Sequence, residues 1–244
     1  MGEVNIGNTR PDLSVVVPSY RGAHRVRLLL ETLVDALDRI ASIEFLVIDD
    51  GSPDDEQALA RAEMRAVEKR TAENRDSRRC RRFYHYCLRE NRGQQYATIV
   101  GIKMARGALI ATVDDDGGHP PAELAAMVRT IVSDNTIDLI YGVPYPTPGS
   151  GRPVRRLGTR LNNVLFRLFL GKPNHVTVTS FRVIRRGLVD RALAVPVRYA
   201  YLSAMLFACK PRVASHRYSV GSLGEMSRYS IVRLIRIYWK LVLY

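Results

Sequence analysis

Short apolar runs alternate with amphipathic segments along the first 141 residues of the chain. The runs rich in β-branched residues predict buried strands, and they cover residues 13–17, 44–48, 83–88, 109–113 and 138–141. Between them, apolar residues recur at helical spacing and predict helices over residues 24–39, 54–71, 94–105 and 122–133. Strands that alternate with helices in this way indicate an α/β fold, in which a mostly parallel sheet is flanked by helices and joined by right-handed crossovers.

The C-terminal part of the chain has a different pattern. Two stretches, residues 155–170 and 231–244, interleave Arg and Lys with aliphatic and aromatic side chains. In the second stretch, Arg233, Arg236 and Lys240 share one helical stripe. We expect both stretches to form basic amphipathic helices that lie in a membrane interface. The alternative is a surface helix that packs its apolar face on the protein core.

The composition fits one globular domain, but the positive charge is concentrated in one part of it. The chain has 244 residues, 46% of them hydrophobic, and a net charge of +13, which suffices for a single core. Residues 1–151 hold 19 basic and 22 acidic side chains, whereas residues 152–244 hold 18 basic side chains and only two acids, a balance of +16. This excess predicts an anionic partner: nucleic acid, an anionic membrane surface or a phosphorylated substrate. The chain lacks an aromatic and basic motif that reads bases, so we expect no nucleic-acid partner.

The cysteines and the apolar stretches predict a cytoplasmic protein. The three cysteines, Cys80, Cys87 and Cys209, are too few and too scattered for a disulfide framework or a zinc site, as expected in a reduced compartment. The N-terminus is polar and does not resemble a signal peptide. The longest apolar stretches, residues 199–209 and 231–244, are too short or too interrupted to span a bilayer.

Three consecutive carboxylates follow the apolar run at residues 109–113. Asp114, Asp115 and Asp116 precede Gly-Gly and Pro-Pro, which end the strand. Asp114 and Asp116 can both reach one divalent ion, and hard oxygen ligands in an open site suit Mg²⁺ or Mn²⁺ shared with substrate phosphates. Asp115 should point away from that ion, because alternate strand positions face opposite sides. A solvated acidic loop is the alternative.

Two other predicted strands also end in polar residues. Pro18-Ser19-Tyr20 follows the first strand and Asp49-Asp50-Gly51-Ser52 follows the second. Ligands of such sheets bind outside the carboxyl ends of the strands, so we expect these ends and the Asp cluster to meet in one crevice. The absence of a Gly-x-Gly-x-x-Gly loop and of a Walker-type lysine loop argues against dinucleotide redox chemistry and P-loop hydrolysis.

Several short segments together resemble a known family. They are VVVPSY at 15–20, VIDDGS at 47–52, NRGQ at 91–94, DDDGGHPP at 114–121, TSFRVIRR at 179–186, and Arg217 followed by GEMSRYS at 224–230. Over residues 13–240 the chain resembles family-two glycosyltransferases of the GT-A fold, which is a Rossmann-like, mostly parallel sheet flanked by helices. Within them it is similar to the polyprenyl-phosphate branch, which includes dolichyl-phosphate mannose synthases and undecaprenyl-phosphate sugar transferases.

The resemblance implies a role for each matching residue. Pro18, Tyr20 and Asp49 would bind the nucleotide-sugar, together with Asp50 and Gln94. Asp114 and Asp116 would hold a divalent metal ion, Mg²⁺ or Mn²⁺, against the diphosphate. Ser180 and Arg182 would lie on the sugar and acceptor side, and Arg217 and Arg228 would face the diphosphate or the acceptor phosphate. As alternatives, Asp49 and Asp50 cap the following turn, and the arginines at 182, 185 and 186 form a solvated face.

The resemblance further implies transfer of a sugar from a nucleotide-sugar to a polyprenyl phosphate, in a single inverting displacement. A metal ion and nearby arginines would neutralise the leaving diphosphate. The acceptor phosphate is already anionic near neutral pH, so it needs positioning more than a strong general base. Residues 1–151 would form the nucleotide-sugar-binding core, and residues 152–244 the acceptor-side and membrane-interface part of the same domain. The protein would then lie on the inner face of the membrane, held by the anionic surface or by a membrane partner subunit.

Two departures from the family pattern leave other functions open. Arg21-Gly22 stands where the family usually has Asn-Glu, and Gly117-Gly118 where it usually has Leu-Gln. Because that Gln helps to hold the metal, its loss favours weaker metal binding. The alternatives are a family-two transferase with a glycan acceptor, and a nucleotide-sugar-binding protein with impaired catalysis.

Overall fold

The computed structural model describes residues 10–40, 42–73, 80–145, 176–195 and 201–219. Its elements, in chain order, are β1 (Leu13–Ser19), α1 (Ala23–Ala36), β2 (Ser42–Asp49), α2 (Asp54–Glu73), β3 (Cys80–Cys87), α3 (Gln94–Met104), β4 (Leu109–Thr112), α4 (Pro121–Ser133), β5 (Leu139–Pro144), β6 (Arg182–Arg185), α6 (Arg186–Leu193), α7 (Leu202–Ala208) and β7 (Val213–Tyr218).

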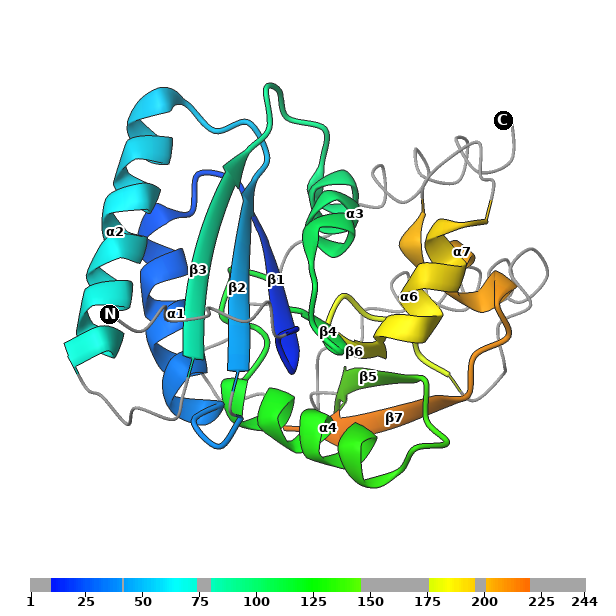
Figure 1. Cartoon of the computed structure of the whole chain (residues 1–244). Coiled ribbons are helices and arrows are strands. Elements are labelled where there is room, and N and C mark those ends of the chain that lie inside the picture. The colour runs from blue at the N-terminus through cyan, green and yellow to red at the C-terminus, as the bar shows by residue number, and fades with distance from the viewer. Residues whose placement is uncertain (1–9, 41, 74–79, 146–175, 196–200, 220–244) are drawn as a thin grey trace, which may run out of the picture.

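One seven-stranded sheet runs through the described part of the molecule, in the order β3-β2-β1-β4-β6-β5-β7 (Figure 1). β1 pairs in parallel with β2 and with β4, and β2 pairs in parallel with β3. β6 is antiparallel to both of its neighbours, β4 and β5, whereas β5 and β7 are parallel to each other. The expected mostly parallel α/β sheet is therefore confirmed, with β6 as its antiparallel member.

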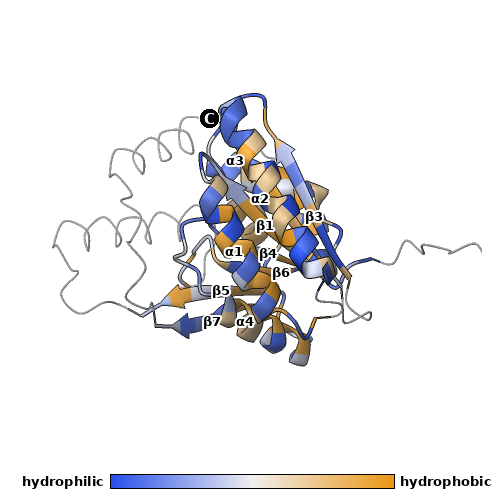
Figure 2. Ribbon diagram, turned by 90° about the vertical axis from the view of Figure 1, so that its left-hand side faces the viewer, coloured by the Kyte–Doolittle hydropathy of each residue, from blue (hydrophilic) through white to orange (hydrophobic). Residues whose placement is uncertain are grey.

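Helices cover both faces of the sheet and produce two separate cores. Helices α1, α2 and α4 pack on one face, while α3, α6 and α7 pack on the other. Strand alternation divides the side chains between them: Val15 and Val17 of β1 face the first core and Val16 faces the second. Hydrophobic residues accordingly run through the strands at the centre of the molecule (Figure 2).

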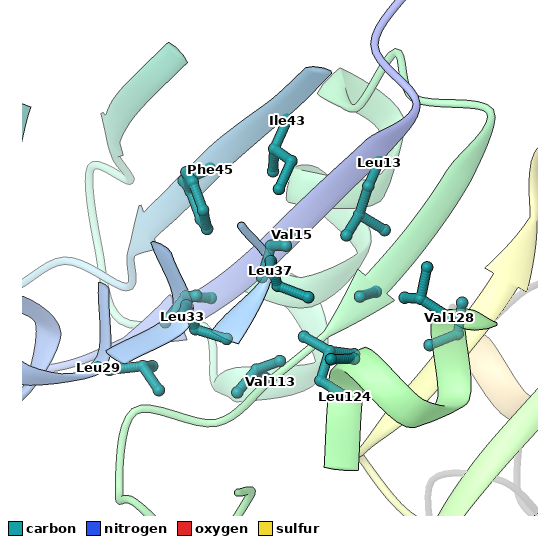
Figure 3. Close-up of a cluster of buried hydrophobic side chains, with 14 of the residues drawn as sticks. Leu13, Val15, Leu29, Leu33, Leu37, Ile43, Phe45, Val113, Leu124 and Val128 are labelled. Carbon is teal, nitrogen blue, oxygen red and sulfur yellow. The ribbon is translucent and has the colours of Figure 1, made fainter. Parts of the chain in front are cut away.

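The core beneath α1 shows how the periodicity of the sequence sets this packing. Leu29 and Leu33 of α1 and Leu37, its C-cap residue, recur every four residues and point toward the sheet, where they meet Val15 and Phe45 (Figure 3). Leu33 and Leu37 are almost completely buried. Burial of a leucine side chain contributes about 1.5–3 kcal/mol, so this stripe holds α1 on the sheet.

The strands and helices predicted for residues 13–141 are all present, with small shifts at their ends. Beyond residue 141, the TSFRVIRR segment contains the short, largely buried strand β6, which was not predicted and which argues against the alternative of a solvated face. The expected amphipathic helices at 155–170 and 231–244 lie outside the described residues. Among the residues that are described, no helix is both long enough and apolar enough to cross a membrane.

We expect Gly101→Ala to destabilise the protein by about 1–3 kcal/mol. Gly101 lies in α3 against β1 and β2, and an added Cβ would collide with the side chains of Val16 and Ile48. Alanine favours a helix over glycine by about 1 kcal/mol, which does not offset two such clashes in a packed core. Urea denaturation measures the effect. Lys103→Ala, on the exposed side of the same helix, is the control and should leave stability nearly unchanged; an equally stable Gly101→Ala variant would show that α3 packs less closely.

Candidate active site

A pocket of about 290 Å³ opens at the carboxyl edge of the sheet, where β1, β2 and β4 end. Its lining residues are Pro18, Ser19, Tyr20, Asp50, Asn91, Gly93, Gln94, Asp114, Asp115 and Asp116. The predicted crevice is therefore present, and it unites most of the residues assigned to the donor and the metal. A second hollow, between the C-terminal end of α1 and α4, contains none of the predicted site residues.

Asp114 is fixed by side chains from two other parts of the fold. Its Oδ1 atom accepts a hydrogen bond from Gln94 Nε2 of α3 at 2.5 Å. Its Oδ2 atom accepts one from the hydroxyl of Ser180, just before β6, at 2.6 Å. Each carboxylate oxygen has two lone pairs, so both atoms can still accept a further ligand.

Asp115 points toward the loop between β1 and α1. Its Oδ2 atom accepts hydrogen bonds from the Ser19 hydroxyl at 2.6 Å and from Arg25 Nη2 at 3.1 Å. The carboxylate lies over Gly22, where an added Cβ would collide with it. Burial raises the pKa of Asp115, although the hydrogen bond from Ser19 and the charge of Arg25 oppose the shift. Asp115 therefore has other partners than Asp114, but it lines the same pocket, and its orientation away from a bound ion stays a prediction.

Asp116 folds back onto its own loop. Its Oδ1 atom accepts a hydrogen bond from the Gly118 N–H at 2.9 Å, and the Gly118 carbonyl accepts one from the Tyr218 hydroxyl of β7 at 3.3 Å. Burial, with the nearby carboxylates adding to it, raises the pKa of Tyr218 to about 12. Tyr218 therefore remains a neutral donor that anchors this loop to the sheet.

His119 orients the same loop. Its Nδ1 atom accepts a hydrogen bond from the Asp114 backbone N–H at 3.0 Å. The imidazole stacks on Phe181, with ring centroids 4.6 Å apart and planes inclined by 8°. Burial lowers the pKa of His119, which favours the neutral ring. Because Nδ1 accepts, the single ring proton is on Nε2, and neither nitrogen offers a free lone pair to a metal ion.

The two aspartates after β2 have different partners. Asp49 Oδ1 accepts a hydrogen bond from the Ser52 N–H at 2.7 Å, so Asp49 caps the following turn. Asp49 is not among the residues that line the pocket. The two oxygens of Asp50 accept hydrogen bonds from the backbone N–H groups of Arg92 and Gly93 at 2.9 and 2.7 Å. Asp50 thereby braces the β3–α3 loop against β2 at the edge of the pocket.

Arg182, expected on the sugar and acceptor side, and Arg217, expected at the phosphates, are not among the described residues that line the pocket. Arg182 is only 2% exposed and lies beneath the site, which rules out the solvated-face alternative for this residue. Arg217 is exposed on β7, on the opposite face of the strand from Tyr218. Arg228 lies outside the described residues.

The donor set of the pocket fits a hard divalent cation. Asp114 and Asp116 present carboxylate oxygens there, the ligand type that Mg²⁺ and Mn²⁺ prefer. In the part of the chain that the structure describes, no three His, Cys, Asp or Glu side chains form a group that could hold a metal ion. Two carboxylates would thus leave the remaining coordination positions to phosphate oxygens and water, as is usual for Mg²⁺.

Sequence reasoning placed Ser19 in the crevice without giving its hydroxyl a role, and it did not find Arg25 or Tyr218 as parts of the site. Ser19 stands between two residues that were singled out, so its hydroxyl could have been considered. The role of Tyr218 depends on the pairing of β7 with β5, which leaves no local signal in the sequence.

Comparisons with known proteins fit this geometry. The family model described as Glycosyl transferase family 2 matches residues 14–193. The undecaprenyl-phosphate 4-deoxy-4-formamido-L-arabinose transferase of Sodalis glossinidius (strain morsitans) is 28% identical over 233 residues, which are 94% of this chain and 66% of that protein. Its namesake from Pseudomonas aeruginosa (strain LESB58) is 29% identical over 236 residues, 94% of this chain and 64% of that protein. The chain thus spans just under two thirds of the length of these curated relatives.

Solved structures show the same fold at low identity. Glucosyl-3-phosphoglycerate synthase from Mycobacterium tuberculosis, in complex with Mn²⁺, uridine diphosphate and phosphoglyceric acid, matches with a TM-score of 0.66 and 14% identity, over 96% of this chain and 76% of that chain. The mannosyltransferase PcManGT from Pyrobaculum calidifontis, in complex with GDP-Man and Mn²⁺, matches with a TM-score of 0.59 and 17% identity, over 96% of this chain and 63% of that chain.

We expect Asp50→Ala to loosen the β3–α3 loop and to cost about 1–3 kcal/mol of stability, since the amides of Arg92 and Gly93 lose the carboxylate that accepts their hydrogen bonds. Amide hydrogen exchange at these two positions measures the loosening, and urea denaturation measures the cost. Asp55→Ala, on the exposed surface of α2, is the matched control. Unchanged exchange in the Asp50→Ala variant would contradict the bracing role.

Proposed function

The chain belongs to glycosyltransferase family 2, and from this we propose that it moves a sugar from a nucleotide-sugar to a polyprenyl phosphate. The transfer inverts the anomeric carbon and depends on a divalent ion, Mg²⁺ or Mn²⁺, held by Asp114 and Asp116. The observation that carries the proposal is the convergence of these carboxylates with Pro18, Tyr20 and Gln94 on one pocket.

The pocket offers what a nucleotide-sugar requires. Tyr20 lines it and is 41% exposed, so its ring is accessible to a base. The carboxylates of Asp114 and Asp116 lie at the same pocket, where a diphosphate could share their cation. Similar folds that were solved with Mn²⁺ and a nucleoside diphosphate or its sugar ester support this arrangement.

The residues of this chain do the positioning. Gln94 and Ser180 fix the two oxygens of Asp114, and His119 and Tyr218 hold the loop that carries Asp116. When bound, the cation neutralises the charge that grows on the leaving diphosphate. Because the carboxylates are held before substrate arrives, little reorganisation is needed in the transition state.

The positive charge of residues 152–244 and the names of the curated relatives support a phosphorylated lipid as acceptor. Residues 152–244 carry 18 basic side chains and two acids, and the curated relatives act, by their names, with undecaprenyl phosphate. A phosphate acceptor is already an anion near neutral pH and attacks without a strong general base. We assign Arg217 and Arg228 to the acceptor or the diphosphate, and residues 152–244 to the acceptor side and the membrane interface.

A second candidate is a nucleotide-sugar-binding protein with impaired catalysis. It is favoured by Gly118, since the family's Gln is missing at this position and Gly118 contributes only backbone atoms to the loop. A transferase with a glycan acceptor remains the other alternative. Incubating the full chain with a panel of nucleotide-sugars and undecaprenyl phosphate, and following both the released nucleotide and the glycosylated lipid, distinguishes transfer to the lipid from these two alternatives.

We expect Asp114→Asn and Asp116→Asn each to lower sugar transfer at least about 100-fold, because charge stabilisation at the diphosphate is lost. Asp115→Asn should lower it much less, since its carboxylate faces Ser19 and Arg25. Product formation with radiolabelled donor measures transfer, and circular dichroism checks the fold. Full activity of either of the first two variants, or of the wild type in a chelator, would disprove the metal assignment.

We expect the full chain to bind vesicles that contain anionic lipid, and salt to weaken the binding. Three cations near an anionic surface contribute roughly 3 kcal/mol, so replacing Arg233, Arg236 and Lys240 by Gln should release much of the protein. Co-sedimentation with vesicles of increasing phosphatidylglycerol content measures this. The matched control replaces Arg61, Arg65 and Lys69, which are exposed on α2. Equal loss in both variants would point to net charge alone, and no loss in either would favour a membrane partner subunit.

A further inference from the structure

Arg182 is a cation that is buried among neutral partners. The residue is 2% exposed at the start of β6. Its Nε atom donates to the Thr112 hydroxyl at 3.1 Å and its Nη1 atom to the Ser203 hydroxyl at 3.2 Å, while the guanidinium carbon lies 5.9 Å from the centroid of the Tyr141 ring. Within the described ranges, no Asp or Glu forms an ion pair with it. A charge buried in this way is costly, so its position calls for a reason.

The hydrogen bonds of Arg182 lead to Asp114. The Thr112 hydroxyl accepts from Arg182 and donates to the backbone carbonyl of Ser180. The hydroxyl of Ser180 in turn donates to Asp114 Oδ2 at 2.6 Å. The Thr112 hydroxyl thus fixes the backbone of Ser180, and the side chain of Ser180 in turn fixes the Asp114 carboxylate.

The sheet itself sets this arrangement. Thr112 of β4 is directly opposite Arg182 of β6 in the antiparallel register. Ser180 precedes β6 by two residues and Asp114 follows β4 by two, so the same register brings them together beyond the strand ends. A shift of one residue would turn Arg182 to the other face of the sheet.

We propose that Arg182 is a positioning residue that acts through Thr112 and Ser180 to hold Asp114 in its metal-binding orientation. The inference rests on the proposed function, because that function gives the divalent ion to Asp114. Partners that orient a metal ligand from behind commonly change metal affinity by about tenfold or more when they are removed. Thr112 and Ser180 occupy this place relative to the Asp114 carboxylate.

A packing role for Arg182 is the competing explanation, and Ser203 separates the two. Ser203 lies on α7, is 3% exposed and accepts a hydrogen bond from the same guanidinium. Loss of the Thr112 hydroxyl or of the Ser203 hydroxyl removes one hydrogen bond from the buried guanidinium of Arg182. Only the Thr112 hydroxyl also bonds the residue that touches Asp114, so Ser203→Ala is a matched control for Thr112→Val.

The test is Mn²⁺ binding to the full chain without nucleotide, followed by the electron paramagnetic resonance signal of free Mn²⁺. We expect Thr112→Val to weaken binding about tenfold, Thr112→Ser to retain it, and Ser203→Ala to leave it unchanged. Thermal unfolding checks that Thr112→Val and Ser203→Ala both remain folded. Ser180→Ala should weaken Mn²⁺ binding as Thr112→Val does. The double variant should bind Mn²⁺ about as tightly as the single variant that has the lower affinity.

Wild-type Mn²⁺ affinity in Thr112→Val and Ser180→Ala would overturn the inference, as would equal weakening in Ser203→Ala. Asp114→Asn distinguishes the failure of the inference from that of the proposed function. If Asp114→Asn binds Mn²⁺ as the wild type does, the metal assignment fails and the role of Arg182 fails with it. If only Asp114→Asn weakens binding, the metal assignment survives and Arg182 has a packing role alone.

Discussion

The parallel register of β1 with β2 and β4 is the constraint on which the site depends. Ser19 at the end of β1 is paired with Asp49 at the end of β2, and β4 lies against the other side of β1. Parallel neighbours end at the same edge of a sheet, so the acidic segments that follow β2 and β4 must come together there. The fold thus concentrates negative charge at one edge before any ligand is present.

Each carboxylate at that edge accepts hydrogen bonds from donors of its own, and these bonds offset the repulsion between the negative charges. Asp50 accepts hydrogen bonds from two backbone amides, and Asp115 accepts hydrogen bonds from the side chains of Ser19 and Arg25. Like charges a few ångströms apart repel strongly away from bulk water, and hydrogen bonds to ionised groups are stronger than neutral ones. The donors therefore turn consecutive aspartates toward different partners, while Asp114, Asp115 and Asp116 all line the pocket.

The sequence allowed prediction of those features that arise from local patterns. The leucines of α1, the valines of β1 and the acidic strand ends follow from periodicity and turn chemistry, and the turn cap at Asp49 was an open alternative that the structure supports. β6 could not be predicted, because a four-residue strand with Arg at both ends is buried only through its pairing with β4 and β5. For the same reason the burial of Arg182 and the contact of Tyr218 with Gly118 depend on strands that meet from distant parts of the chain.

The carboxylate of Asp115 over Gly22 has a consequence for how this sequence can change. Its Oδ2 atom occupies the space that any side chain at position 22 would need, and position 22 is where the family usually carries Glu. Gly22 and Asp115 are thus two halves of one steric arrangement, because a larger side chain at 22 collides with the carboxylate unless that carboxylate moves or is replaced. Substitutions at these positions should be strongly epistatic, so related sequences are expected to change both together: glycine at 22 where position 115 is acidic, and a larger side chain at 22 where position 115 is small.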